Sequence, residues 1–371
     1  MTTETDLEIF IVATPGLEPA LLDEVREAGF AGATQGPGGI TFRGGWPDVW
    51  RANLVLRGAT RVLVRIGAFR AFHLAQLDKR ARKFPWGDVL RKDVPIKVEV
   101  TCKASKIYHA GAAQQRIERA ITETLGAQIA ADAGLVLKVR IDDNLVTFSV
   151  DSSGESLHKR GHKQAVSKAP MRETLAALFL RQMGFDGSQS VVDPMCGSGT
   201  FLIEAAEIAA GLNPGRSRSF AFENLSSFDA TTWAALKTPR PLVAPSLGFF
   251  GSDRDDGAIR SSETNAKAAG VSYWCQFTRA AVSDLTPPDT RPGIVIVNPP
   301  YGERIGNKKL LFGLYGALGA TLKERFSGWS VGIVTTDAGL VKATGLPILP
   351  PGPPVAHGGL KVRLFRTAAL K

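Results

Sequence analysis

Cysteine is scarce in this chain of 371 residues, and no apolar run is long enough to cross a membrane. Cys102, Cys196 and Cys275 are far apart and lack metal-ligand spacing, which argues against a disulfide framework and against a zinc site. The apolar stretch 7–13 is short, and no basic segment precedes it, so it does not look like a secretion signal. These absences predict a reducing compartment, the cytoplasm by default, with no membrane and no metal partner.

Low-complexity tracts and fixed-period repeats are also missing, so the length is available for two or three globular domains. The composition is 44% hydrophobic and 22% charged, as in globular proteins. Lys and Arg number 45 against 35 Asp and Glu, which gives a net charge of +10 and a pI near 9.6. A basic balance of this size favours a polyanionic partner, although many basic proteins have none.

The clearest chemical signal is the stretch 293–302. Its β-branched residues predict a strand buried on both faces of a parallel sheet, and Asn298-Pro-Pro-Tyr301 ends that strand. Ligands bind at the carboxyl ends of strands in open α/β sheets. There the Asn298 side-chain oxygen and the Pro299 carbonyl can accept both hydrogens of a nucleobase amino group, while Tyr301 stacks on the base. A plain Pro-Pro turn is the competing interpretation. The candidate catalytic residues are Asn298, Pro299, Pro300 and Tyr301.

Residues 190–206 predict a strand, a glycine-rich turn and a helix whose first N–H groups face a ligand. A nicotinamide site is the obvious competitor, but Leu202 stands where the third glycine of that motif belongs. Asp193 also suits a ligand with a positive amino group and a sulfonium better than a pyrophosphate. Cys196 is interpreted as a packing residue. The candidate cofactor contacts in this turn are Asp193, Pro194, Met195, Cys196, Gly197, Gly199 and Thr200.

Two acidic residues follow the next predicted strands. Asp253 ends the strand 247–253 and can accept both hydroxyls of a ribose, in a nicotinamide cofactor as well as in S-adenosylmethionine (SAM). Asp284 follows the strand 277–282 and can accept from an adenine amino group. Arg254 and Asn298 complete the candidate cofactor set. The order of these signals resembles the class I methyltransferases that methylate amino groups with SAM. The resemblance implies a Rossmann-like domain with a mostly parallel, seven-stranded sheet.

The N-terminal half predicts an α+β region with short strands, amphipathic helices and a hairpin at 136–150. Residues 96–121 resemble the THUMP domain of RNA-modifying enzymes, and the unit before them resembles the ferredoxin-like domain that accompanies it. The resemblance implies docking of structured RNA. The candidate RNA contacts are Lys103, Lys106, His109 and Arg116.

The stretch 151–163 is polar and basic, so it predicts a linker between domains. Lys159 and Arg160 there are candidates for following an RNA backbone, and a plain solvated linker is the alternative. The stretch 216–245 is interpreted as an insertion without an assigned function. The predicted domains are a ferredoxin-like unit at 1–45, a THUMP domain at 46–152 and a methyltransferase domain at 153–371.

Residues 153–161, 169–177, the Asp193 turn and 298–304 together resemble the bacterial THUMP-containing 23S rRNA guanine-N2 methyltransferases, over essentially the whole chain. The resemblance implies direct transfer of a methyl group from SAM to a guanine amino group, without a covalent enzyme intermediate. Four alternatives stay open: a tRNA guanine-N2 methyltransferase, a DNA amino methyltransferase, a nicotinamide dehydrogenase and a non-catalytic RNA-binding assembly factor. The tetrapeptide alone would serve adenine or cytosine as well, and the oligomeric state is not predicted.

Overall fold

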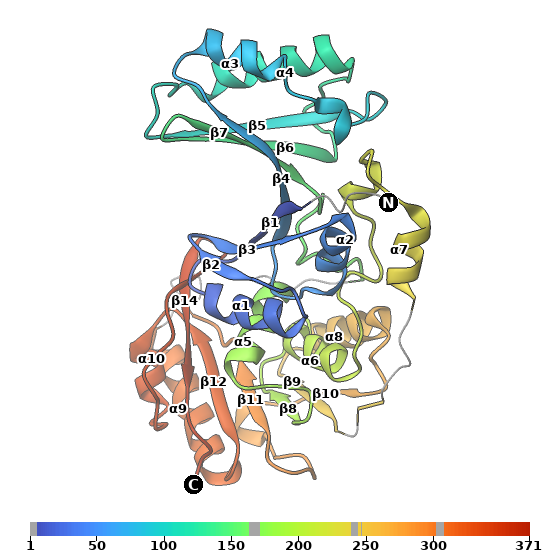
Figure 1. The fold of residues 1–371 in the computed structure, drawn as a ribbon. Coiled ribbons are helices and arrows are strands. Elements are labelled where there is room, and N and C mark those ends of the chain that lie inside the picture. The colour runs from blue at the N-terminus through green and yellow to red at the C-terminus, as the bar shows by residue number, and fades with distance from the viewer. Residues whose placement is uncertain (1–5, 163–170, 239–243, 246, 302–307) are drawn as a thin grey trace. The chain divides into compact units, whose positions relative to one another are not determined.

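The structure is a computed structural model that shows two units, each with its own sheet (Figure 1). The α/β class and the mostly parallel, seven-stranded sheet after an α+β region are confirmed. The domain boundaries proposed after residues 45 and 152 stay predictions. The residues that the structure describes are 6–162, 171–238, 244–245, 247–301 and 308–371.

The first unit comprises residues 6–13, 22–157 and 218–238 and contains one sheet of seven strands. These strands are β1 (Leu7–Val12), β2 (Thr34–Gly36), β3 (Gly39–Gly44), β4 (Arg61–Arg70), β5 (Ile96–Lys103), β6 (Leu135–Asp142) and β7 (Leu145–Asp151). Their order is β2-β3-β1-β4-β7-β6-β5, in which β5 and β6 are parallel and the other neighbours antiparallel. Strand β4 pairs with β1 along one edge and with β7 along the other, so it belongs to both halves of the sheet.

Helices cover the sheet of the first unit, and α3 and α4 lie on one face of β5, β6 and β7 (Figure 1). Ile117 and Ile121 of α4 are fully buried one turn apart, as the amphipathic pattern predicts. The Phe148 ring of β7 packs against Phe84 and Trp86, with centroid distances of 5.0 and 4.8 Å. The helical elements are α2 (Trp46–Val55), α3 (Leu74–Ala81), η1 (Trp86–Asp88), α4 (Ala110–Leu125), η2 (Ala221–Asn224) and α7 (Ala230–Lys237); α1 (Glu18–Glu27) is divided between the units.

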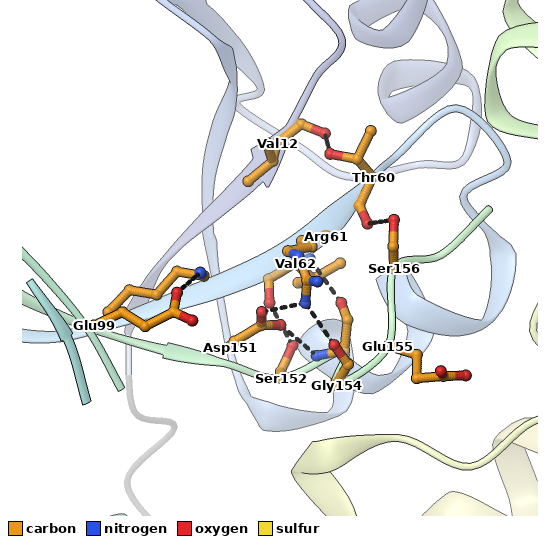
Figure 2. Close-up of polar contacts among 12 residues, drawn as sticks. Val12, Thr60, Arg61, Val62, Glu99, Asp151, Ser152, Gly154, Glu155 and Ser156 are labelled. Carbon is orange, nitrogen blue, oxygen red and sulfur yellow. Dashed lines mark hydrogen bonds and ion pairs between the residues drawn. The ribbon is translucent and has the colours of Figure 1, made fainter. Parts of the chain in front are cut away.

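A buried network of hydrogen bonds lies at the end of β7 (Figure 2). Ser152 Oγ donates to the Val62 carbonyl oxygen at 2.7 Å, and the Val62 N–H donates to Ser153 Oγ at 2.8 Å. Asn53 of α2 joins both serines, because its Nδ2 donates to Ser152 Oγ at 2.9 Å and its Oδ1 accepts from Ser153 Oγ at 2.6 Å. The network fixes the point at which the chain leaves the sheet.

The segment 218–238 belongs to the first unit, although it lies far along the sequence. The Phe222 N–H donates to the Ser152 carbonyl oxygen at 3.0 Å. The Phe222 ring, fully buried, stacks on Trp50 of α2 at 5.9 Å between centroids and meets Trp233 of α7 edge-on at 5.0 Å. Most of the stretch 216–245, interpreted from the sequence as an insertion, therefore belongs to this unit, and its buried aromatic residues join the unit's core.

The second unit comprises the described residues of 14–21, 158–217 and 239–371. Its strands are β8 (Val191–Asp193), β9 (Phe249–Asp253), β10 (Cys275–Arg279), β11 (Ile294–Val297), β12 (Ser330–Thr335), β13 (Val355–His357) and β14 (Leu360–Arg366). They form a sheet in the order β10-β9-β8-β11-β12-β14-β13, parallel from β10 to β12 and antiparallel beyond. Strand β8 comes first along the chain among these strands and lies between β9 and β11. The chain adds β9 and β10 on one side of β8 and then crosses to β11 on its other side, so the strand order reverses at β8. Ligands bind at such switch points in open sheets.

The carboxyl ends of β8, β9, β10 and β11 share one edge of this parallel sheet, which positions the candidate site. Val295 and Val297 of β11 pack with Leu318 and Leu322 of α9 in one buried cluster. No helix within the described residues is long and apolar enough to span a membrane. The helical elements are α5 (Glu173–Gln182), α6 (Thr200–Ala209), α8 (Asp256–Ala269), η3 (Val282–Asp284), α9 (Lys308–Arg325) and α10 (Ala338–Ala343).

Candidate active site

The tetrapeptide Asn298–Tyr301 leaves the carboxyl end of β11, whose four residues are all buried. Gly293 precedes the strand, and a Cβ there would overlap the backbone carbonyl oxygen of Ser190, so the close approach to the segment before β8 requires glycine. The Pro300 carbonyl oxygen accepts from the Tyr315 hydroxyl of α9 at 3.4 Å. The tetrapeptide is thus held from the strand before it and from the helix after it. Residues 302–304 of the family pattern lie outside the described residues.

Asn298 has a buried amide oxygen, Oδ1, for which the described part of the chain supplies no hydrogen-bond partner. An unpaired buried acceptor is unfavourable, so a ligand that donates a hydrogen bond to this atom would be stabilised there. Pro299 is buried, and Pro300 and Tyr301 are half-buried. Burial raises the pKa of Tyr301 to about 12, so its phenol stays neutral at physiological pH. A strand end with a free amide oxygen and a neutral aromatic ring can hold an amino-bearing planar base.

The glycine-rich turn runs from Asp193 to the start of α6 at Thr200. Asp193 is 2% exposed, and its Oδ1 accepts from the Met195 N–H at 3.1 Å. Burial, with a smaller contribution from the charge of Asp253, raises the pKa of Asp193 to about 8. A cation bound at this carboxylate would offset the burial, so the turn favours a positively charged ligand.

Asp253 joins the turn to the neighbouring strand. Its Oδ2 accepts from the Gly197 N–H at 3.1 Å, and the Cys196 N–H donates to the Ser252 carbonyl oxygen at 3.0 Å. The structure therefore brings the predicted residues of the turn and Asp253 together. Arg254 is exposed and follows directly.

Asp284 ends the short η3 element beyond β10 and is exposed. Its Oδ1 accepts from the Ser283 hydroxyl at 3.2 Å. The Ala280 N–H at the end of β10 donates to the Asp253 carbonyl oxygen at 3.0 Å, so the two acid-bearing segments follow paired strands. This is the arrangement expected for a ligand that extends across strand ends.

Cys196 is buried, and burial raises the pKa of its thiol well above its ordinary value. Its Sγ lies 3.6 Å from Ser262 Oγ of α8. A neutral, packed thiol is a poor nucleophile, which agrees with the interpretation of Cys196 as a packing residue. Among the described residues, no three His, Cys, Asp or Glu side chains gather as metal ligands would.

The sequence did not predict a small pocket beside the turn, which is lined mainly by residues of polar types. His162 lines it, and its Nδ1 is buried without a partner among the residues described. Its Nε2 lies 3.5 Å from Glu207 of α6, and burial lowers the pKa of this histidine. The sequence signal for this pocket was the presence of Glu204 and Glu207, one turn apart on the otherwise apolar α6. The pocket is lined by His162, Glu173, Ser198, Thr200, Ile203, Glu204 and Asn265.

The structure separates the candidate RNA contacts into exposed and buried residues. Arg160 is 1% exposed, and its Nε donates to Glu204 Oε1 of α6 at 3.0 Å. The prediction that Arg160 follows an RNA backbone is therefore wrong, because a buried, paired guanidinium does not face solvent. The exposed candidates are Lys103, Lys106, His109, Arg116 and Lys159.

Comparison with known proteins matches two parts of the chain to family models. Residues 160–347 match the family described as "RMKL-like, methyltransferase domain", and residues 8–63 match the "RlmL ferredoxin-like domain". The chain is 33% identical to "Ribosomal RNA large subunit methyltransferase K/L" of Syntrophotalea carbinolica over 363 residues, which is 92% of this chain and 51% of that protein. The chain thus spans about half the length of the K/L relatives that it matches.

A relative of similar length is slr0064 of Synechocystis sp., whose name assigns it provisionally as an RNA methyltransferase. It is 30% identical over 96% of this chain and 95% of its own. The crystal structure of SMU.472 in complex with S-adenosylhomocysteine (SAH) has a TM-score of 0.86 and 25% identity, covering all of both chains. The predicted family is confirmed, whereas the THUMP assignment of the middle region stays a prediction. The chain belongs to the RMKL-like methyltransferase family and begins with a ferredoxin-like domain of the RlmL type.

Proposed function

We propose that this protein transfers a methyl group from SAM to the exocyclic amino group of a guanine in RNA, and that the RNA is 23S rRNA. The observation that carries the proposal is the buried, unpartnered Oδ1 of Asn298 at the end of β11. Its position at the switch point of the sheet is one where ligands bind. The names of the K/L relatives support a ribosomal RNA.

The cofactor fits the charges of the glycine-rich turn. SAM supplies an electrophilic methyl group, and it carries a positive sulfonium and a positive amino group. The buried Asp193 carboxylate and the turn held by Asp253 would bind its positive end. Asp253 and Asp284 would accept hydrogen bonds from the ribose and the adenine, with Arg254 beside them. The bound SAH in SMU.472 supports a ligand of this class.

The tetrapeptide would prepare the amino group. The lone pair of an exocyclic amine is conjugated into the ring, so the free amine is a poor nucleophile. Asn298 Oδ1 and the Pro299 carbonyl oxygen would accept hydrogen bonds from its two N–H groups. These bonds would turn the lone pair out of the ring plane, while Tyr301 stacks on the base. Pro300 fixes this turn. No enzyme nucleophile is required, and a base in a helix would first be flipped out.

A methylation assay tests the function directly. The purified protein is incubated with methyl-labelled SAM and, in parallel, with 23S rRNA that lacks modifications, with 16S rRNA, with tRNA and with DNA. Nucleoside mass spectrometry then identifies the product. We expect N2-methylguanosine from 23S rRNA alone. Methyladenosine, methylation confined to tRNA or DNA, or absence of transfer to any of the four would contradict the proposal.

A further inference from the structure

Three loops of the first unit meet at one end of its half-sheet β5-β6-β7. They are the segments 71–73 after β4, 104–109 after β5 and 143–144 between β6 and β7. The Ala71 N–H donates to the Asn144 carbonyl oxygen at 2.9 Å. The Asn144 N–H donates to Ser105 Oγ at 3.0 Å, and the Lys106 N–H donates to Asn144 Oδ1 at 2.8 Å. Segments far apart in the sequence therefore form one continuous surface.

This surface combines exposed aromatic rings with lysines. The Tyr108 side chain is 83% exposed, and Phe72 is 41% exposed. The Lys106 ammonium lies 5.6 Å from the centroid of the Phe72 ring, which keeps the charge at this surface. Lys103 is exposed at the end of β5. Phe72, Lys103, Lys106 and Tyr108 are called the Tyr108 surface below.

Acidic neighbours of the Tyr108 surface are already paired with arginines. Asp142 Oδ2 lies 2.6 Å from Arg140 Nη2, and Asp143 Oδ2 lies 3.8 Å from Arg70 Nη1. Asp142 also interacts with Lys103, its register partner on β5, so the charge of Lys103 is partly offset. Among the residues described, no carboxylate forms an ion pair with Lys106. The surface suits an anionic ligand with flat rings.

The loop that carries Tyr108 is anchored on both sides. Ile107 is 4% exposed, so the residue before the tyrosine is buried in the core. His109, the residue after it, caps α4, because its Nδ1 accepts from the Ala112 N–H at 2.9 Å. A ring held on such a loop loses little conformational freedom when a ligand stacks on it. The exposure of Tyr108 is thus a fixed feature of the fold.

We propose that Tyr108 stacks on an unpaired base of the substrate RNA and that Lys103 and Lys106 bind the adjacent phosphates; this rests on the RNA methyltransferase function proposed above. Stacking requires a base whose face is free, which a base inside an RNA helix does not offer. The first unit therefore binds a single-stranded segment of the RNA. A protein partner is the competing occupant, but lysine is depleted at protein interfaces.

Fluorescence anisotropy on the full chain tests this inference. The probes are a fluorescein-labelled, eight-nucleotide, single-stranded RNA of mixed sequence and the blunt duplex of the same sequence. We expect Tyr108→Ala to weaken binding of the single strand about tenfold, since stacking of one base has this size. Binding of the duplex should change by less than about twofold. Tyr108→Phe keeps the ring and should bind as the unchanged protein does.

A lysine variant and a matched tyrosine variant complete the design. Lys106→Ala should reduce the slope of log affinity against log salt by about 0.7, the value for one phosphate contact on a single strand. Tyr273 is 92% exposed between α8 and β10 of the second unit, so Tyr273→Ala controls for loss of any exposed tyrosine. It should leave both affinities unchanged. Thermal unfolding of each variant verifies that the fold is kept.

Three outcomes would overturn the inference: no binding of the single strand by the unchanged protein, unchanged binding by Tyr108→Ala, or an equal loss in Tyr273→Ala. Unchanged binding of the single-stranded RNA by Tyr108→Ala would favour a protein partner at the Tyr108 surface. The methylation assay separates this failure from a failure of the proposed function. If the protein methylates guanine in 23S rRNA and Tyr108→Ala keeps the KM for that RNA, the stacking role alone is wrong. If no RNA is methylated while Tyr108→Ala loses the single strand, the methyltransferase proposal is wrong and the binding surface stands.

Discussion

Arg61 Nη1 lies 2.5 Å from Asp151 Oδ2 and 2.5 Å from the carbonyl oxygen of Gly154 (Figure 2). One guanidinium therefore holds both the last residue of β7 and the loop that follows it. The Asp151 side chain is fully buried, whereas that of Arg61 is 31% exposed. Burial raises the pKa of Asp151, and the charge of Arg61 opposes this shift. The pair thus keeps a buried carboxylate next to the segment that leads out of the first unit.

Removing the Arg61 charge tests how much this pair stabilises the fold. We expect Arg61→Leu to lower the free energy of unfolding by roughly 2 kcal/mol, less than the ~3–5 kcal/mol for a fully buried pair because Arg61 is partly exposed. Arg43 pairs with Asp6 at the surface, so Arg43→Leu is the control and should change stability by less than about 0.5 kcal/mol. Denaturant unfolding measures both. Equal effects would contradict a special role of the Asp151 pair.

The same variant has a defined pH dependence. The folded-state pKa of Asp151 is raised, so protonation of Asp151 stabilises the fold below the unfolded pKa, and this contribution is lost as pH rises through the folded value. A protonated Asp151 is neutral, so its burial no longer has to be offset by the charge of Arg61. We therefore expect the defect of Arg61→Leu to be larger at pH 8 than at pH 4. Thermal midpoints across this range measure it, and a defect that grows toward acid pH would show the sign to be wrong.

Asp193 should link SAM binding to pH. Burial raises its pKa to about 8, and a bound cation favours its ionised form. We expect the affinity for SAM to rise from pH 6 to pH 7.5, with release of protons on binding at pH 7. Calorimetry in two buffers with different ionisation enthalpies counts these protons. Asp193→Asn should remove most of the pH dependence of SAM affinity. If this variant keeps the pH dependence, a group other than Asp193 releases the proton.

Asn298 should act on turnover and not on cofactor affinity. We expect Asn298→Ala to slow methyl transfer by about a hundredfold or more, the size seen when one oriented hydrogen-bonding group is lost from an active site. The dissociation constant for SAM should change by less than about threefold. Single-turnover kinetics and calorimetry measure the two quantities. If the rate of methyl transfer and the affinity for SAM fall together, Asn298 supports the cofactor or the fold instead of the amino group.

The Phe222 side chain should contribute strongly to the stability of the first unit. The side chain is fully buried against Trp50, Phe220 and Trp233, so Phe222→Ala should destabilise this unit by about 3 kcal/mol. Hydrogen exchange should quicken in α2 and α7. Phe312 of α9 is 45% exposed, and Phe312→Ala is the matched control with little expected effect. Unchanged exchange in α2 after Phe222→Ala would mean that the segment is only loosely attached.

The sequence predicted the elements whose signals are local. The buried run before Asn298, the glycine turn after β8 and the amphipathic pattern of α4 each depend on neighbouring residues, and each predicted element forms. The pattern at 114–125 predicts the end of α4 correctly, whereas the helix begins earlier, at Ala110. The sequence of residues 61–67 predicts a strand over that range, whereas β4 continues to Arg70. Its last residues pair with β7, a partner far along the chain that periodicity does not reveal.

The residues that sequence reasoning misjudged depend on distant partners. Arg160 stands in a basic, polar run, and such a run normally faces solvent. Its burial becomes evident only with Glu204 of α6, which is its partner. The segment 218–238 likewise has aromatic residues whose purpose appears only when Trp50 packs against them. In both cases the deciding contact is between side chains that no local pattern connects.

Strand β4 has a consequence for how this protein can be divided. Arg61–Arg65 pair with β1 on one edge, while the same strand pairs with β7 on the other. A fragment that begins after residue 45 would leave β4 with a bare edge, and bare edges promote aggregation. The ferredoxin-like and middle regions therefore share one seven-stranded sheet, and a cut after residue 45 would divide that sheet between two fragments.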